Sequence, residues 1–218
     1  MISGIRLRRW CLVLLLALGA VAFAQTGTRP VLLVLGDSLS AEYGLPRDTG
    51  WVKLLADRLA TLGPEGAPQY NVVNASISGE TTSGGRTRLP ALLAQSRPAI
   101  VIIELGGNDG LRGLPLSAMR ENLSAMVEAS QKSGARVLLV GLRIPPNYGR
   151  TYTDGFFATF ADVARDHKAA LAPFLLEGFA DQPELFQGDR IHPSVKAQAK
   201  MLDNVWPHLQ RLLAPRGK

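Results

Sequence analysis

The stretch Val31-Leu-Leu-Val-Leu-Gly-Asp-Ser38 joins an unbroken apolar run to a small polar motif. A short run of this kind, rich in leucine and β-branched residues, is typical of a fully buried strand. Similar runs follow along the chain, the last of them weak, at 70–74, 100–105, 137–142 and 169–173. Near-continuous apolar strands indicate a parallel sheet that is covered on both faces.

Longer segments with helical spacing separate these runs, and Gly63 and Gly134 serve as helix stop signals. The expected helices span 51–62, 82–93, 116–133, 156–167 and 194–213. Strands that alternate with helices predict an α/β fold, here a three-layer α/β/α sandwich on a doubly wound, five-stranded parallel sheet. The sequence contains no repeat, low-complexity tract or linker that would indicate a second domain.

The first 24 residues have the pattern of a secretory signal peptide. Three arginines precede an apolar run at 10–23, which ends in the cleavage motif Ala22-Phe-Ala24. The run is shorter than the roughly 20 residues that a membrane-spanning helix requires. We therefore expect cleavage after Ala24, with residues 25–218 forming one exported domain. A retained signal anchor is the alternative.

Charge and cysteine content exclude several classes of function. Three of the 24 basic residues and none of the 18 acidic ones lie in the expected signal peptide, which leaves a formal charge of +3. This charge is too small, and too dispersed, to indicate a nucleic-acid partner. The single cysteine, Cys11, also lies in the signal peptide, so the mature chain has no disulfide and no cysteine metal site.

The residues after the first strand include a candidate nucleophile. Ligands of open α/β sheets bind outside the carboxyl ends of the strands, so residues in these positions are candidate site residues. The segment Gly36-Asp-Ser-Leu-Ser40 places the Ser38 hydroxyl at a strand-to-loop junction, where we expect a following helix to direct N–H groups toward it. A helix-capping role is the alternative for Asp37 or Ser38.

The loops after the second and third strands supply candidate hydrogen-bond donors. Gly79 can expose a backbone N–H to an oxyanion because glycine allows close approach. Asn108, which follows two glycines, can donate from its carboxamide to the same oxyanion. Taken alone, each residue also fits an ordinary turn.

An acid and a base lie close together near the C-terminus. Asp189 precedes His192 by three residues, and Pro193 suits the first turn of the final helix. The carboxylate can fold back onto Nδ1 of the imidazole and leave Nε2 free as a base. A surface pair or a stray metal ligand is the alternative, and His167 and His208 have no such partner.

Together these residues provide a nucleophile, a base, an orienting acid and oxyanion donors. Acyl transfer needs this set and no metal or organic cofactor. No Gly-x-Ser-x-Gly elbow surrounds Ser38, which argues against the α/β-hydrolase fold.

At these positions the chain resembles the SGNH (GDSL-type) hydrolases. The four sequence blocks of that superfamily are matched by Gly36-Asp-Ser38, Gly79, Gly107-Asn-Asp109 and Asp189-x-x-His192. More narrowly, the mature chain is similar over essentially its whole length to the TesA-type periplasmic thioesterase/arylesterase/lysophospholipases. That similarity includes the strings at 35–41, 73–79, 104–113 and 146–149.

The resemblance implies the flavodoxin-like strand order 2-1-3-4-5. It also implies an oxyanion hole formed by the backbone N–H groups of Ser38 and Gly79 and the side chain of Asn108. Two segments, 109–113 and 144–148, are expected to border an acyl groove, with substrate contacts from Asp109, Gly110, Leu111, Ile144, Pro145, Asn147 and Tyr148. The chain departs from the family at Glu42, where relatives often have glycine, and in an extended stretch at 62–69.

The implied substrates are acyl esters, thioesters and lysophospholipids, and the implied enzyme is a periplasmic monomer with no nucleic-acid partner and no stable membrane span. A preference for acyl-CoA is not carried over, because Glu42 could disfavour anionic substrates. The alternatives are an exported carbohydrate O-acetylesterase of the same fold and a non-catalytic lipid- or glycan-binding protein. Leu111, Leu114 and Ile144 near the expected rim favour an acyl chain longer than acetyl.

Overall fold

The computed structural model describes residues 29–62 and 70–213. Within these ranges, five strands form one all-parallel sheet in the order β2-β1-β3-β4-β5. This order and the α/β class agree with the sequence-based prediction. The strands are β1 (Val31–Gly36), β2 (Asn71–Asn74), β3 (Ile100–Glu104), β4 (Arg136–Val140) and β5 (Ala170–Ala172).

The centre of the sheet is the core of the molecule. β1 pairs with β2 on one side and β3 on the other, so that Leu33 lies opposite both Val73 and Val101. All side chains of 32–35 and 100–103 are fully buried. The unbroken apolar sequence of these strands follows from this position, because helices cover both faces of the sheet.

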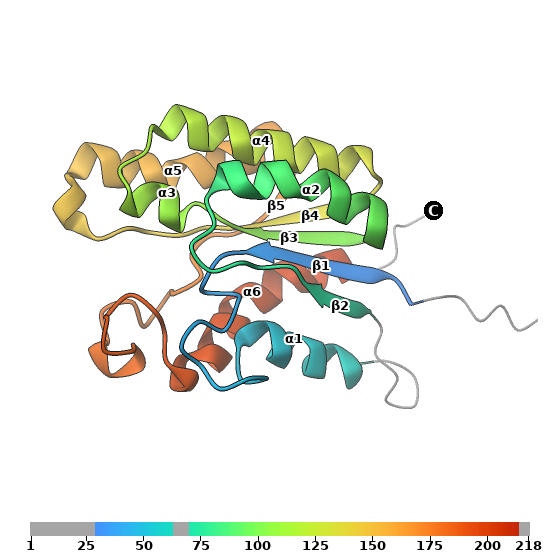
Figure 1. Cartoon of the computed structure of the whole chain (residues 1–218), viewed down its shortest axis with the longest axis horizontal. Helices are drawn as coiled ribbons and strands as arrows, with labels where there is room; N and C mark the ends of the chain where they lie inside the picture. The colour runs from blue at the N-terminus through green and yellow to red at the C-terminus, as the bar shows by residue number, and fades with distance from the viewer. Residues whose placement is uncertain (1–28, 63–69, 214–218) are drawn as a thin grey trace, which may run out of the picture.

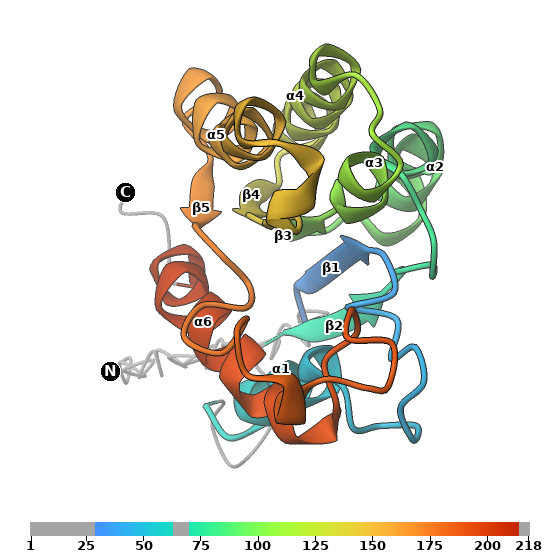
Figure 2. The same cartoon turned by 90° about the vertical axis from the view of Figure 1, so that its left-hand side faces the viewer.

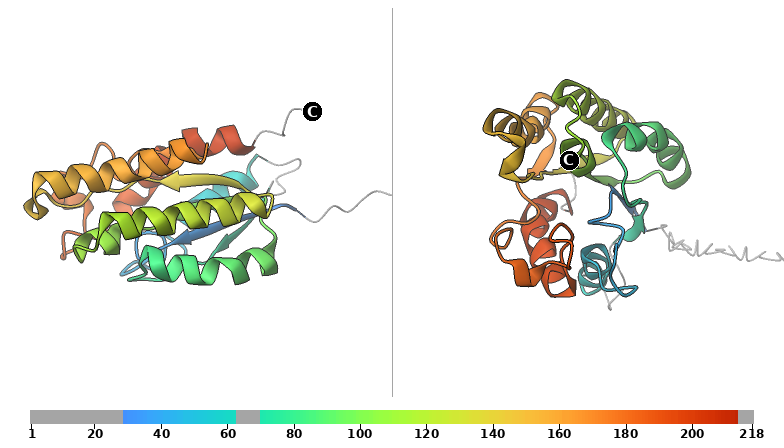
Figure 3. Two further views of the ribbon diagram at one scale, coloured as in Figure 1. Left: turned by 90° about the horizontal axis from the view of Figure 1, so that it is seen from above. Right: turned by 60° about the vertical axis from the view of Figure 1, so that its left-hand side comes forward.

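The helices form two layers (Figures 1 and 2). α1 (Trp51–Ala60) and α6 (Gln198–Leu213) pack together on one face. α2 (Thr82–Ser96), α4 (Leu116–Lys132) and α5 (Arg150–Asp166) cover the other face. Seen from above, these three helices lie side by side over the sheet (Figure 3). The observed layers are those expected of a doubly wound sheet.

The predicted starts of two helices were wrong. α5 begins at Arg150, six residues before the expected start. The final helix begins at Gln198, after a short 3₁₀ helix, η4 (Val195–Ala197), so Pro193 is not in its first turn. Pro193 instead forms an isolated antiparallel bridge with Phe186, which closes the loop that carries Asp189 and His192.

Three short elements at the edge of the sheet were not predicted: α3 (Gly107–Leu111), η2 (Pro146–Tyr148) and η3 (Pro183–Leu185). Gly134 ends α4 as expected, with a φ of 91°. The expected signal peptide, Gly63 and most of the extended stretch at 62–69 lie outside the described residues. Within the described ranges, no helix is both long and apolar enough to cross a bilayer.

Candidate active site

The predicted site residues gather at the carboxyl edge of the sheet, which faces the viewer in Figure 2. Ser38 follows β1, Gly79 follows β2, and Asn108 lies in α3 directly after β3. The loop between β5 and α6 carries Asp189 and His192 back to the end of β1. Parallel strands end at one edge, so residues from distant parts of the chain meet there.

Ser38, His192 and Asp189 form a continuous hydrogen-bonded chain. The Ser38 Oγ lies 2.9 Å from Nε2 of His192, and Nδ1 of His192 lies 2.7 Å from Oδ2 of Asp189. An ionised carboxylate only accepts hydrogen bonds, so it favours the tautomer with the proton on Nδ1. Nε2 is then free to accept the Ser38 proton, which is the geometry of a serine nucleophile with its base.

The turn at Asp189 holds this carboxylate in its charged form. Its Oδ1 accepts hydrogen bonds from the backbone N–H groups of Ile191 and His192, at 2.9 and 3.0 Å. Burial opposes the charge, but the two backbone bonds and the imidazole outweigh it and lower the pKa of Asp189 to about 2. Arg190 adopts a φ of 58°, which reverses the chain between the acid and the base.

Tyr43 contacts the base and was not predicted from the sequence. Its ring centroid lies 4.5 Å from that of His192, at an interplanar angle of 40°. Its backbone carbonyl accepts a hydrogen bond from Nε2 of Gln187, which ties the loop after β1 to the loop before α6. Nothing in the residue pattern indicated this contact, because it depends on how the two loops meet.

A turn, and not a helix, follows Ser38. The N–H of Ala41 donates to the carbonyl of Asp37 at 2.9 Å, and the N–H of Tyr43 donates to that of Ser38 at 3.3 Å. The first helix starts at Trp51, which is the predicted position, so this turn and not α1 orders the backbone around Ser38. The turn still places the hydroxyl at the edge of the sheet.

Two backbone donors are free at the predicted oxyanion site. The N–H groups of Ser38 and Gly79 donate no hydrogen bond to any residue that the structure describes. Gly79 has a φ of 80°, a conformation that glycine adopts without strain. Its carbonyl accepts a hydrogen bond from Nη2 of Arg112 at 3.1 Å, which fixes the peptide from the other side.

Asn108 lies between the loops that carry these two donors. Its Nδ2 donates to Oδ2 of Asp37 and to the carbonyl oxygen of Glu80, each at 3.0 Å. Asp37 and Glu80 are the direct neighbours of Ser38 and Gly79. A carboxamide has only two N–H donors, so Asn108 must share or release one of these bonds to reach a third acceptor.

Asp109 does not line the groove with its side chain. The residue is 3% exposed, and its carboxylate accepts hydrogen bonds from the N–H and the hydroxyl of Thr82, at 2.8 and 2.5 Å. Thr82 begins α2, so Asp109 satisfies donors at the start of that helix. In this structure the Asp109 carboxylate is thus directed toward α2 and not toward the segment at 144–148.

The other groove residues bring two segments together. The Tyr148 hydroxyl donates to the carbonyl of Leu111 at 2.7 Å, which ties η2 to the end of α3. Gly110 is buried, and an added Cβ would lie 2.7 Å from the side chain of Ile144, so these segments pack closely. Pro145 and Asn147 are exposed. A pocket of about 450 Å³ beside them is lined by Arg143, Ile144, Pro146, Arg150, Thr153 and Asp154.

Glu42, next to the loop of the proposed nucleophile, has a structural role. It adopts a φ of 58°, the region that favours glycine. Its carboxylate accepts hydrogen bonds from the N–H groups of Asp48 and Gly50, at 3.1 and 2.7 Å, and so orders the loop before α1. Its charge is thus directed toward this loop.

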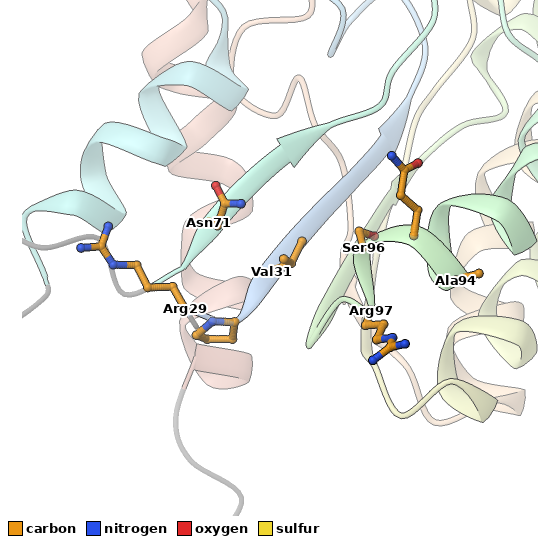
Figure 4. Close-up of a pocket in the computed structure, with 8 residues that line it drawn as sticks. Arg29, Val31, Asn71, Ala94, Ser96 and Arg97 are labelled. Atoms are coloured by element: carbon orange, nitrogen blue, oxygen red, sulfur yellow. The ribbon is translucent and has the colours of Figure 1, made fainter. Parts of the chain in front are cut away.

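A larger pocket, of about 740 Å³, lies at the opposite edge of the sheet (Figure 4). Val31 and Asn71, the first residues of β1 and β2, line it, together with Ser96 at the end of α2. Ser38 follows the other end of β1, so this pocket is separate from the hydroxyl and imidazole pair.

Residues 34–200 match the GDSL-like Lipase/Acylhydrolase family. The chain belongs to this family. The match confirms the resemblance drawn from the sequence motifs, and it makes the chain a hydrolase of acyl esters. The matched range begins in β1 and ends in α6, so it includes all five strands.

This acylhydrolase is similar to bacterial enzymes over most of its length. It is 49% identical over 196 residues to the esterase TesA of Pseudomonas aeruginosa, covering 90% of this chain and 96% of the relative. It is 40% identical over 182 residues to thioesterase 1/protease 1/lysophospholipase L1 of Escherichia coli K12, with 84% of each chain covered. A crystal structure of TesA superposes with a TM-score of 0.79 at 50% identity, covering 84% of this chain and 99% of that one.

Proposed function

We propose that this acylhydrolase is an exported serine esterase and thioesterase that forms an acyl-enzyme on Ser38. The observation that carries the proposal is the hydrogen-bonded chain from the Ser38 Oγ through His192 to Asp189, with lengths of 2.9 and 2.7 Å. Acyl transfer requires this combination of nucleophile, base and orienting acid.

In the first step, the Ser38 Oγ attacks the carbonyl carbon while Nε2 of His192 takes the hydroxyl proton. The carbonyl π bond opens, and the negative charge moves to its oxygen, which faces the N–H groups of Ser38 and Gly79 and the amide of Asn108. The tetrahedral species then collapses, and His192 gives its proton to the departing alcohol or thiol. A water molecule repeats these steps on the acyl-enzyme and releases the carboxylic acid.

We infer that the substrates include lysophospholipids and other esters of longer acyl chains. The segments 109–113 and 144–148 would border the acyl chain, and the exposed apolar side chains of Leu114 and Tyr148 lie in or next to them. The similarity to enzymes named esterase and thioesterase/lysophospholipase supports the same substrate classes. Export rests on the signal-peptide pattern of the first 24 residues, and we propose the periplasm as its destination.

The proposed nucleophile is tested by labelling the mature protein with a fluorophosphonate probe. The wild-type protein should be labelled and should hydrolyse p-nitrophenyl esters, whereas Ser38→Ala should do neither. Ser133→Ala, an equivalent hydroxyl deletion at the distant end of α4, is the matched control and should behave as wild type. Labelling that persists in Ser38→Ala would assign the nucleophile elsewhere, and an unlabelled wild-type protein would indicate a binding protein.

The proposed substrate class is tested with p-nitrophenyl esters from acetyl to palmitoyl. We expect kcat/KM to be higher for octanoyl than for acetyl. A maximum at acetyl, with no activity from octanoyl upward, would contradict the lipid proposal and favour the O-acetylesterase.

A further inference from the structure

A carboxyl group with no obvious role lies directly beneath the nucleophile loop. Glu104 is the last residue of β3, stands opposite Gly36 in the sheet, and is 0% exposed. Its Oε2 accepts a hydrogen bond from the Ser40 hydroxyl at 2.7 Å and a long one, 3.4 Å, from the N–H of Asp37. Its Oε1 is buried and has no partner among the described residues. An ionised carboxylate is costly in such a position, because one of its oxygens lacks any donor.

A second buried carboxyl group lies next to it. Asp37 is 2% exposed, and its Oδ1 accepts a hydrogen bond from the N–H of Leu39 at 3.0 Å. Its Oδ2 accepts from Nδ2 of Asn108, also at 3.0 Å. Asp37 therefore has two donors that stabilise a negative charge, including one from a proposed oxyanion residue.

The packing around Glu104 explains the glycine that precedes Asp37. A Cβ on Gly36 would lie 2.7 Å from Oε2 of Glu104 and 2.7 Å from Oγ of Ser40. The carbonyl of Ser40 also accepts a hydrogen bond from Nδ2 of Asn74, at the end of β2. Glu104 and Ser40 thus connect the loop after β1 to both neighbouring strands.

The structure also shows which charged partners these two acids have. Within the described ranges, neither carboxyl group forms an ion pair with a lysine or an arginine. Burial raises the pKa of Asp37 to about 6, against the opposing effects of Leu39, His192 and Asn108, and nearby Asp109 adds to the rise. Burial, followed by the charge of Asp37, raises the pKa of Glu104 well above its usual range. Two neighbouring buried carboxyl groups do not both ionise readily.

We propose that Glu104 is a positioning residue that supports the loop carrying Ser38 while its own side chain stays neutral and protonated. Asp37 is then the only anion of the pair, and it orients Asn108. The inference rests on the proposed roles of Ser38 and Asn108. A second negative charge at Glu104 would act against the negative charge that develops on the substrate oxygen, in a site where water screens poorly. Glu104 thus keeps its proton, supports the loop through hydrogen bonds and does not touch the substrate.

Glu104→Gln and Glu104→Ala separate the charge from the hydrogen bond. Glutamine is neutral and retains a carbonyl oxygen for Ser40 and Asp37, so its kcat near neutral pH should remain close to that of the wild type. Alanine removes this support, and displacement of the loop should lower kcat by about a hundredfold. Glu128→Gln, an exposed substitution on α4, is the matched control.

Three readouts distinguish a protonated Glu104 from a side chain that only fills space. A wild-type-minus-Glu104→Gln infrared difference spectrum at neutral pH should contain the carbonyl band of a protonated carboxylic acid. The kcat of the wild type should fall at high pH as Glu104 ionises, and Glu104→Gln should lack that loss. The folded-state pKa is raised, so the stability that Glu104 contributes is present at low pH and is lost as pH rises through that pKa. As pH rises through this pKa, the melting temperature should therefore fall less for Glu104→Gln than for the wild type.

A kcat for Glu104→Gln as low as that of Glu104→Ala would overturn the proposal, as would an absent protonated-acid band. If Glu104→Ala does not fold, the infrared band and the pH profile of Glu104→Gln decide the question. Fluorophosphonate labelling of wild-type Ser38 tests the proposed catalytic role separately. A labelled wild type without the infrared band would reject only the role of Glu104.

Discussion

At the scale of single residues, Asn108 is expected to serve three hydrogen-bond acceptors with only two N–H donors. Both of its N–H donors already serve Asp37 and Glu80, at 3.0 Å each. If it is a main oxyanion donor, Asn108→Ala should lower kcat by about a hundredfold to a thousandfold. The measurement is kcat on a p-nitrophenyl ester, with melting temperature recorded to correct for any unfolding. A kcat that is unchanged would leave the oxyanion to the two backbone donors.

Asp189→Asn should be nearly as damaging as loss of the nucleophile. The amide can donate to Nδ1 of His192 and so favours the wrong tautomer, an effect worth up to about 10⁴ in kcat in a comparable triad. The kcat for ester hydrolysis and the rate of fluorophosphonate labelling should fall together. A mild effect on both would indicate that Ser38 and His192 work as a dyad.

The lowered pKa of Asp189 predicts a specific acid sensitivity. Its pKa is about 2 in the folded protein, against an ordinary value of 3.8. The stability it contributes is thus present above 3.8 and is lost as pH falls toward 2. The side chain is 39% exposed, so solvent weakens the effect. Melting temperatures of the wild type and Asp189→Asn should converge over this interval, and a constant difference would contradict the prediction.

The sequence was sufficient to predict some site residues and not others. Ser38 was proposed because a small, distinctive motif follows the first strand, and His192 because Asp189 precedes it by three residues. Glu104 had a usable signal, since a carboxylate ends the otherwise apolar strand at 100–103. Tyr43 had none, because its contact with the imidazole arises only when two distant loops meet.

At the scale of elements, the contact between η2 and α3 shapes the proposed groove. Tyr148→Phe removes the hydrogen bond to the carbonyl of Leu111 and should lower the free energy of unfolding by about 1 kcal/mol. Because the two segments would border the acyl chain, KM should rise more for octanoyl than for acetyl esters.

The matched control is Tyr70→Phe, which deletes a hydroxyl that accepts a hydrogen bond from Arg136 at the opposite edge of the sheet. This variant should change stability without changing the preference for chain length. Equal effects of the two variants on chain-length preference would show that Tyr148 has no special role in the groove.

Short elements escaped prediction for a physical reason. α3 has five residues and η2 has three, too few for a helical repeat to show in the sequence. α5 begins early because Gly149, with a φ of 88°, turns the chain directly into the helix, a feature that residue type alone does not specify. The long helices and the central strands have enough apolar residues to be recognised.

At the scale of the whole molecule, the central strands carry the stability. Ile102 of β3 is fully buried between β1 and β4. Ile102→Ala should lower the free energy of unfolding by about 2–5 kcal/mol, through lost apolar contact and the cavity left behind. Denaturant unfolding measures this change. At temperatures where the variant stays folded, its kcat should be close to that of the wild type. A large loss of kcat under these conditions would show that packing at Ile102 affects the geometry of the site.

The layered α/β class follows from the apolar runs, because only a sheet covered on both faces buries such strands. The strand order does not follow from periodicity, since several orders would bury the same residues. It was expected from the family resemblance, and the observed order β2-β1-β3-β4-β5 agrees with it. The position of the loop before α6 depends on packing between α1 and α6, which no local pattern specifies.

The contact between Ser38 and His192 spans 154 residues. A ribosome must therefore add these 154 residues after Ser38 before the two groups can meet, and until then the nascent chain has the hydroxyl without the imidazole. The proposed ester hydrolysis requires both groups, so it begins only after His192 has been synthesised and its loop has docked beside Ser38. Recovery of turnover during refolding should accordingly report the final event of assembly, later than signals from the sheet.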